Sequence, residues 1–202
     1  MKAIGYKTPG AIDREEALND IILEKPVAKG RDLLVAVKAV SVNPVDYKIR
    51  QNVGPEEGGG KVLGWDAAGV VVGTGPEVVG FKPGDNVYYA GSIARPGTNS
   101  EFHLVDERIV GHMPATLNAA EAAALPLTAI TAWEMLFDRL DIRRPVPGAA
   151  HAVLIIGGAG GVGSIAIQLL RALSDITVIA TASREETKAW VKELGAHHVL
   201  DH

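Results

Sequence analysis

The spacing of apolar and polar residues changes character along the chain. Up to about Glu107, short apolar segments are separated by glycine and proline, a pattern typical of an all-β domain with many turns. Alternation of apolar and polar residues predicts its clearest strand at 33–42 and further strands at 68–72 and 86–90. Between the last two strands, residues 83–84 (Pro-Gly) predict a type II turn, because proline fixes the first central φ and glycine allows the positive second one.

Two segments interrupt this β pattern. Residues 43–50 predict a helical turn after the long strand, since Asn43 is a good N-cap and Pro44 a good first helical residue. The glycine-rich residues 52–61 predict a surface loop that could cover a cleft. The alternative for both segments is a connection without further function.

After Pro114 the period becomes helical and then alternates between strands and helices. Asn118 to Glu121 resembles a capping box, Pro126 is expected to end or kink that helix, and a second helix carries apolar residues as far as Leu140. A loop at 141–150 leads into a βαβ pattern. Its expected elements are strand 152–156, helix 164–173, strand 176–180, helix 185–194 and strand 198–200.

The segment from Gly158 to Gly163 carries the most specific chemical signal. It reads Gly158, Ala159, Gly160, Gly161, Val162 and Gly163, and its first, third and last residues fit the G-x-G-x-x-G pattern. The pattern follows an apolar strand and opens a helix, the context in which it binds a dinucleotide pyrophosphate at a helix N-terminus. We expect Gly158 to permit the turn, Gly160 to clear the approach of the phosphates, and Gly163 to let the helix lie close to the strand.

The end of the next strand indicates which coenzyme is preferred. An NAD site needs an acid there for the ribose hydroxyl, but the chain reads Ala-Thr-Ala-Ser-Arg. Ser183, Arg184 and, one turn later, Lys188 could instead bind a 2'-phosphate, which favours NADP over NAD. The alternative is that Ser183 and Glu186 form a capping box and Arg184 is a solvated surface residue.

Composition excludes several classes of partner and site. A net charge of -4 gives no basic surface for nucleic acid or an anionic membrane. With no cysteine, the chain has no disulfide and no thiolate zinc site. The N-terminus lacks the apolar region of a signal peptide, and no apolar run approaches the roughly 20 residues of a membrane span, so a cytoplasmic protein is expected.

Four motifs occur together in a familiar order: 41–46, the turn at 80–85, 125–133 and the glycine turn at 159–163. With them the whole chain resembles the quinone oxidoreductase-like branch of the medium-chain dehydrogenase/reductase superfamily. The resemblance implies a GroES-like catalytic domain, residues 1–120, followed by a truncated Rossmann domain, residues 121–202, and a homodimer at full length. A Rossmann sheet of six strands would need on the order of 90 further residues, so we expect an N-terminal piece of a longer protein.

The same resemblance bears on metal and mechanism. Zinc-dependent relatives have a cysteine where this chain has Asn43 and a His-Glu pair where it has Trp65-Asp66, so we expect no zinc. Without a Lewis acid, a quinone or α,β-unsaturated carbonyl is the expected hydride acceptor, because it delocalises the charge left by addition.

By resemblance, Asn43 and Thr131 lie near the nicotinamide and substrate. Lys48 takes the place of a tyrosine that faces the cleft, a role that Tyr47 could also fill, and Asp46 is either structural or catalytic. Trp65 is either an aromatic wall for substrate or a core residue. The function expected is that of an NADPH-dependent reductase; the alternatives are an alcohol dehydrogenase or aldehyde reductase, and an NADPH-binding protein without turnover.

Overall fold

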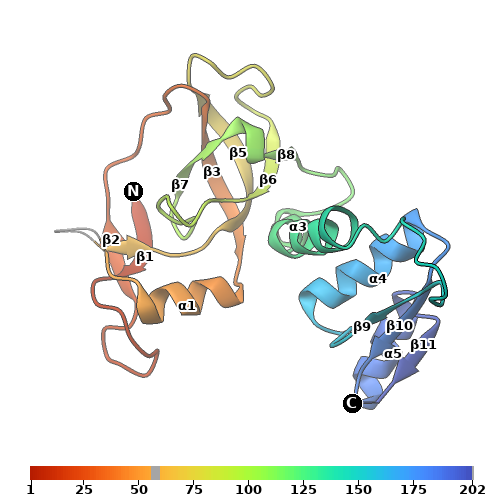
Figure 1. The fold of residues 1–202 in the computed structure, drawn as a ribbon. Helices are drawn as coiled ribbons and strands as arrows, with labels where there is room; N and C mark the ends of the chain where they lie inside the picture. The colour runs from red at the N-terminus through yellow and green to blue at the C-terminus, as the bar shows by residue number, and fades with distance from the viewer. Residues whose placement is uncertain (56–59, 202) are drawn as a thin grey trace. The chain divides into compact units, whose positions relative to one another are not determined.

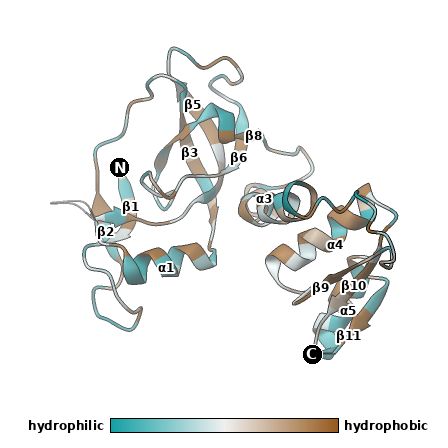
Figure 2. Ribbon diagram, viewed as in Figure 1, coloured by the Kyte–Doolittle hydropathy of each residue, from teal (hydrophilic) through white to brown (hydrophobic). Residues whose placement is uncertain are grey.

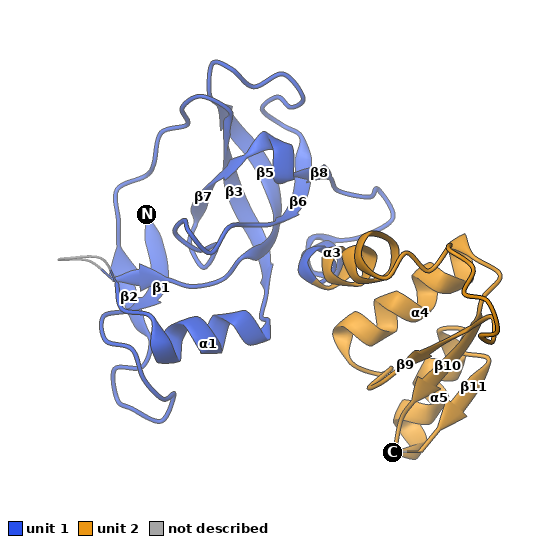
Figure 3. Ribbon diagram, in the orientation of Figure 1, with its two compact units in different colours: residues 1–127 blue, residues 128–202 orange. Residues whose placement is uncertain are grey.

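The computed structural model describes residues 1–55 and 60–201 and divides into two compact units, Met1–Leu127 and Thr128–His202 (Figures 1 and 3). Antiparallel strands dominate the first unit, and parallel strands with helices form the second. The predicted fold class, an all-β part followed by an α/β part, is therefore confirmed. In the described residues, no helix is long and apolar enough to cross a membrane.

The strands of unit 1 form two antiparallel sheets, ordered β2-β1-β4 and β7-β3-β5-β6-β8. Their bounds are β1 Lys2–Tyr6, β2 Asn19–Ile22, β3 Asp32–Ser41, β4 Lys61–Val62, β5 Asp66–Thr74, β6 Asn86–Ala90, β7 Phe102–Asp106 and β8 Gly111–His112. The helical segments are α1 Pro44–Asn52, the 3-10 turn η1 Glu107–Ile109 and α2 Ala119–Ala123, while α3 Pro126–Trp133 runs from unit 1 into unit 2.

The long strand β3 organises unit 1 because it pairs with β5 over its whole length and with β7 over its first half. The prediction at 33–42 is confirmed to within a residue at each end, and those at 68–72 and 86–90 lie within β5 and on β6. Alternation places a set of apolar side chains in the core between these strands. That core comprises Leu33, Val35, Ala67, Val71, Val87, Tyr89 and Val105.

The helix and the turn predicted within the β region are both present in the structure. Asn43 is the N-cap of α1, which is longer than the helical turn expected. Gly84 has a φ of +98°, and the Asp85 N–H donates to the Lys82 carbonyl, as in the predicted type II turn. Of the loop expected at 52–61, residues 56–59 lie outside the described part of the chain.

Unit 2 contains a parallel sheet ordered β11-β10-β9, with helices connecting its strands. Its elements are the π-helix η2 Glu134–Arg139, β9 Ala152–Ile155, α4 Gly161–Leu173, β10 Thr177–Thr181, α5 Glu185–Glu193 and β11 His198–Leu200. Figure 2 shows β9 as a strongly hydrophobic strand. The core between sheet and helices includes Leu136, Ile155, Ala166, Ile167, Leu170, Val178, Ala180 and Val191.

Two helix predictions in this region need correction. The continuous helix expected to reach Leu140 ends as α-helix at Trp133 and continues as a π-helix, a rarer form that apolar spacing does not reveal. The helix expected from Ser164 begins at Gly161, because the glycines belong to its first turn rather than to the loop before it. The other βαβ elements lie within a residue or two of their predicted bounds.

Candidate coenzyme turn and candidate active site

The glycine turn joins β9 to α4 within unit 2. Its positive φ, +66°, is at Gly157 rather than at Gly158, so the expectation that Gly158 permits the turn is wrong by one residue. Gly158 is needed for packing instead, because a Cβ there would lie 2.9 Å from the Ala180 Cβ. The Gly157 N–H donates to Thr181 Oγ1 at 2.8 Å and the Gly158 N–H to the Thr181 carbonyl at 3.0 Å, which ties the turn to the end of β10.

The two remaining glycines of the pattern have different surroundings. A Cβ on Gly163 would lie 2.7 Å from the Gly157 carbonyl oxygen and 2.8 Å from the Gly158 Cα, so the start of α4 lies close to the turn that follows β9. A Cβ on Gly160 would meet only the Gly157 oxygen, at 3.3 Å. Gly160 and Gly161 are exposed and line a hollow of about 550 Å³ together with residues of β9.

The start of α4 has the chemistry of an anion site. Its N-cap, Gly160, provides no side-chain hydrogen bond to the first turn. Unsatisfied N–H groups at a helix start carry partial positive charge and suit a phosphate. These residues therefore fit the pyrophosphate of a dinucleotide, and Ala159 and Val162 contribute packing against the core of the unit.

The candidate 2'-phosphate residues lie just beyond β10. Ser183 and Arg184 are exposed, and the Arg184 guanidinium is 3.5 Å from the Glu186 carboxylate. Lys188 is engaged more closely: its Nζ lies 3.0 Å from Asp201 Oδ2 and 3.2 Å from Glu185 Oε1. The hydrogen bonds that Lys188 donates to Asp201, the larger cause, and to Glu185 raise the pKa of Lys188. A phosphate at this position would have to compete with these carboxylates for Lys188.

The alternative interpretation of Ser183 as a capping residue is not what the structure shows. The N-cap of α5 is Arg184, whose backbone N–H donates to Thr187 Oγ1 at 3.2 Å. The Thr187 hydroxyl in turn donates to the Arg184 carbonyl at 2.8 Å. Ser183 and Glu186 therefore do not form the capping box, because the helix begins one residue later than that pairing requires.

In unit 1, the candidate catalytic residue Asn43 belongs to a buried polar cluster. Its Nδ2 donates to Asp66 Oδ2 at 2.8 Å, and the Leu127 N–H donates to Asp66 Oδ1 at 2.9 Å. Asp66 is fully buried. Burial is the main cause that raises the pKa of its carboxyl to about 6, against the opposing hydrogen bonds from Asn43 and Leu127, and the nearby Asp46 adds to the rise.

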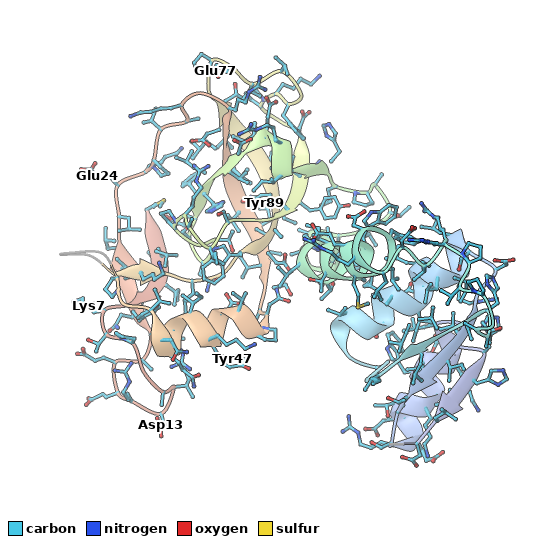
Figure 4. The ribbon with its side chains drawn as sticks, viewed as in Figure 1. Lys7, Asp13, Glu24, Tyr47, Glu77 and Tyr89 are labelled. Carbon is cyan, nitrogen blue, oxygen red and sulfur yellow. The ribbon has the colours of Figure 1, made fainter. Side chains whose placement is uncertain are left out.

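Helix α1 carries the other candidates of unit 1. Asp46 is buried, and its carboxylate accepts from the Asn43 N–H at 2.7 Å and the Gly64 N–H at 2.9 Å, which favours a structural role. Lys48 is exposed on the same helix, next to Tyr47. Figure 4 shows Tyr47 projecting outward from α1.

Thr131 is on α3, in the part of that helix that belongs to unit 2. It is exposed, whereas the next residue, Ala132, is fully buried in the core of unit 2. Asn43 is thus the buried N-cap of α1, and Lys48 is an exposed residue of that helix. The glycine turn is bonded to Thr181, two residues before Ser183, while Thr131 lies on a separate helix.

The donor set around Asn43 does not fit zinc. The Asn43 amide uses its nitrogen as a donor to Asp66, and Trp65, 2% exposed, packs in the core with its indole N–H donating to the Ser92 carbonyl. Core packing, one of the two interpretations of Trp65, is confirmed. Across residues 1–55 and 60–201, no group of three or more histidine, aspartate or glutamate side chains is placed to hold a metal.

The sequence marked Asp66 as part of the pair that replaces His-Glu in zinc-dependent relatives, but it did not predict the hydrogen bonds of Asp66. Asp66 begins an apolar strand, and an acidic residue at the start of such a strand is a weak signal by itself. Neither Leu127, 61 positions away, nor Asn43, 23 positions away, can be paired with it from spacing.

The fold and these motifs place the chain in a known class. Residues 29–125 match the alcohol dehydrogenase GroES-like domain family. The chain belongs to the medium-chain dehydrogenase/reductase superfamily, in its quinone oxidoreductase-like branch, as the four sequence motifs indicated.

Individual relatives support this placement. A zinc-type alcohol dehydrogenase-like protein of Staphylococcus aureus is 45% identical, with 100% of this chain and 60% of the relative covered. A 2-methylene-furan-3-one reductase of Solanum lycopersicum is 34% identical, with 100% and 52% covered. The chain therefore spans between half and three fifths of the length of these curated relatives.

Solved structures are similar over the same part. A putative zinc-dependent alcohol dehydrogenase protein from Rhizobium etli is 66% identical with a TM-score of 0.98, covering 100% of this chain and 59% of that one. The Escherichia coli quinone oxidoreductase in complex with NADPH is 26% identical with a TM-score of 0.80, covering 99% and 58%.

Proposed function

We propose that the protein is an oxidoreductase that uses NADPH to reduce a quinone or an α,β-unsaturated carbonyl without zinc. The observation that carries the proposal is the start of α4, where a glycine turn leads into a helix whose first N–H groups have no side-chain cap. A pyrophosphate would accept hydrogen bonds from those groups. The NADPH named for the Escherichia coli structure supports the choice of coenzyme class.

The phosphate preference rests on the residues after β10. No carboxylate follows that strand directly, and Ser183 and Arg184 are exposed there. Ser183 would donate a hydrogen bond and Arg184 a charged one to a 2'-phosphate, with Lys188 as a second cation. Arg184→Ala should raise the KM for NADPH by about 10- to 100-fold, the loss of one charged hydrogen bond, and leave the KM for NADH unchanged. Arg139→Ala, an exposed arginine on η2, is the matched control.

The acceptor class follows from the donors around Asn43. When bound, the nicotinamide supplies the hydride. An amide and an indole replace ligands that a zinc site would use, so a simple ketone would lack a Lewis acid. A quinone or enone needs less help, because its phenolate or enolate form delocalises the negative charge. In this proposal the Asn43 amide and Lys48 donate hydrogen bonds to that oxygen, and Thr131 helps to orient the ring system.

The proposal extends to the organisation of the whole protein. Residues 1–120 are assigned as the catalytic domain and 121–202 as the first half of the NADP-binding domain. We propose a cytoplasmic homodimer with a small-molecule substrate and neither nucleic acid nor membrane as partner.

The second candidate is an alcohol dehydrogenase or aldehyde reductase, favoured by the words used for the Staphylococcus aureus and Rhizobium etli relatives. Steady-state assays of the full-length protein on a quinone, an enone and an aldehyde, with NADPH and NADH, separate the two. The proposal expects turnover of quinone or enone, NADPH preferred, in metal-free protein. Aldehyde turnover that requires about one zinc per chain would support the second candidate instead. Coenzyme binding without any acceptor-dependent oxidation would indicate a non-catalytic protein.

A further inference from the structure

The buried carboxyl of Asp66 connects two parts of the chain that the proposed function uses. It begins β5, is 0% exposed and accepts from two neutral donors, the Asn43 amide and the Leu127 N–H. No salt bridge to Asp66 is present among residues 1–55 and 60–201. A carboxyl buried without a cation is costly, so its position calls for a reason beyond stability.

Each hydrogen bond fixes a different element. The bond from Asn43 Nδ2 holds the side chain at the N-cap of α1, between the end of β3 and the helix that carries Lys48. The bond from the Leu127 N–H holds the first turn of α3. Negative charge at a helix N-terminus is favourable, so this contact suits the carboxylate form. Four residues further along the same helix is Thr131.

The rest of the cluster leaves Asp66 little freedom. The Thr98 hydroxyl donates to the Asp66 carbonyl, and Asp46 fixes the Asn43 backbone through its N–H. With its backbone and one N–H of its amide held, Asn43 presents its second amide N–H in a defined direction. That N–H is the group that the proposed function assigns to the oxygen of the acceptor.

We propose that Asp66 is a positioning residue of the reductase site, which orients the amide of Asn43 and holds the first turn of α3. The inference rests on the proposed function, because it assumes that Asn43 serves hydride transfer. Its alternative is that Asp66 only stabilises unit 1.

The variant Asp66→Asn separates these roles at nearly constant shape. A side-chain amide can accept one of the two hydrogen bonds, but its NH2 then faces the other donor. In the full-length protein we expect kcat with NADPH and quinone to fall by about 100-fold, the cost of a misplaced reacting group, with the KM for NADPH unchanged. Glu107→Gln is the matched control, since Glu107 is also buried and accepts from the Gly80 and Val79 N–H groups at the opposite end of β3. It should lower thermal stability and leave kcat unchanged.

A reciprocal exchange sharpens the test. In the double variant Asn43→Asp/Asp66→Asn, donor and acceptor trade places, so the buried pair is complete and the Leu127 N–H keeps an acceptor. We expect the melting temperature to recover while kcat stays low, because the amide N–H is no longer at position 43. Recovery of both would show that Asp66 is structural only and overturn the inference, as would an unchanged kcat in Asp66→Asn. If the wild-type protein turns over no acceptor, the proposed function fails and takes this inference with it.

Discussion

The pH dependence of stability in unit 1 should be governed in part by the buried His103, which can be tested by removing its titration. His103 is 5% exposed on β7, between the Tyr89 hydroxyl at 3.0 Å from Nδ1 and the Pro96 carbonyl at 3.0 Å from Nε2. A carbonyl can only accept, so Nε2 carries the proton and Nδ1 accepts from Tyr89. Figure 4 shows Tyr89 among the strands of unit 1.

The magnitude follows from the two protonation states. Burial, the largest cause, lowers the pKa of His103 from its ordinary 6.5 to about 4. Between these values the unfolded chain binds a proton that the folded chain does not, so stability falls as the pH falls. At up to 1.36 kcal/mol per pH unit, acidification from about pH 7 to about pH 4.5 should cost about 2 kcal/mol through this group.

Asp66 acts in the opposite direction. Its pKa is raised from 3.8 to about 6, so below that value the folded chain binds a proton that the unfolded chain does not. Stability therefore rises by about 2 kcal/mol as the pH falls from about 6 to about 4, which offsets most of the loss at His103. A plot of wild-type unfolding free energy against pH would therefore not reveal either contribution by itself.

The assay compares variants by urea unfolding at several pH values. His103→Gln keeps a donor for the Pro96 carbonyl but does not titrate, so its stability relative to wild type should increase by about 2 kcal/mol on acidification from about pH 7 to about pH 4.5. Fluorescence of Trp65, with the two tryptophans of unit 2 replaced by phenylalanine, reports unit 1 specifically. If the free energies of unfolding of wild type and His103→Gln change in parallel with pH, the reasoning is refuted.

Three further substitutions test the packing described above. Gly163→Ala places a Cβ 2.7 Å from the Gly157 oxygen and should cost about 1–3 kcal/mol by overpacking and weaken NADPH binding in a fluorescence titration. Gly54→Ala should do neither, because its Cβ would meet no heavy atom of residues 1–52 or 60–201 within 4 Å. Tyr6→Phe removes a hydroxyl that donates to the Ile49 and Val53 carbonyls and should cost about 1 kcal/mol in urea unfolding. Leu136→Ala empties a core position that is 1% exposed, and calorimetry should show a loss of about 2–5 kcal/mol.

The regular elements could be predicted because their signals are local. The strand at 33–42 and the helix at 185–194 follow directly from apolar spacing, and Asn43 and Gly84 mark a helix start and a turn through their own conformational preferences. The π-helix after Trp133 has no such signal, since a segment of six residues is too short for its wider turn to show in the apolar spacing. Gly157 was missed for a related reason: adjacent glycines share the same preference, and only the geometry of the turn selects one of them.

The candidate site shows the same division between local and long-range information. The glycine pattern identifies the phosphate end of a coenzyme site because the backbone itself provides the chemistry. The cluster around Asp66 could not be predicted, because its hydrogen bonds join β5 to residues that only the tertiary fold brings near. The position of Asp66, considered in the sequence only for its lack of zinc chemistry, proved to hold a buried carboxyl that joins the N-cap of α1 to the start of α3.

The preference between NADP and NAD depends on contacts that the sequence pattern does not contain. From the sequence, Arg184 and Lys188 are two cations available to a phosphate. In the structure, Asp201 contacts Lys188. Because β11 pairs in parallel with β10, Asp201 at the end of β11 lies beside α5, the helix that follows β10. A bound 2'-phosphate must therefore displace Asp201 or share Lys188 with it, whereas Arg184 meets only an exposed glutamate at 3.5 Å. The exposed Arg184–Glu186 pair is weaker in water than the Lys188–Asp201 pair. Arg184 is consequently the residue on which phosphate selectivity should depend most, and Lys188 should contribute mainly once Asp201 is neutralised.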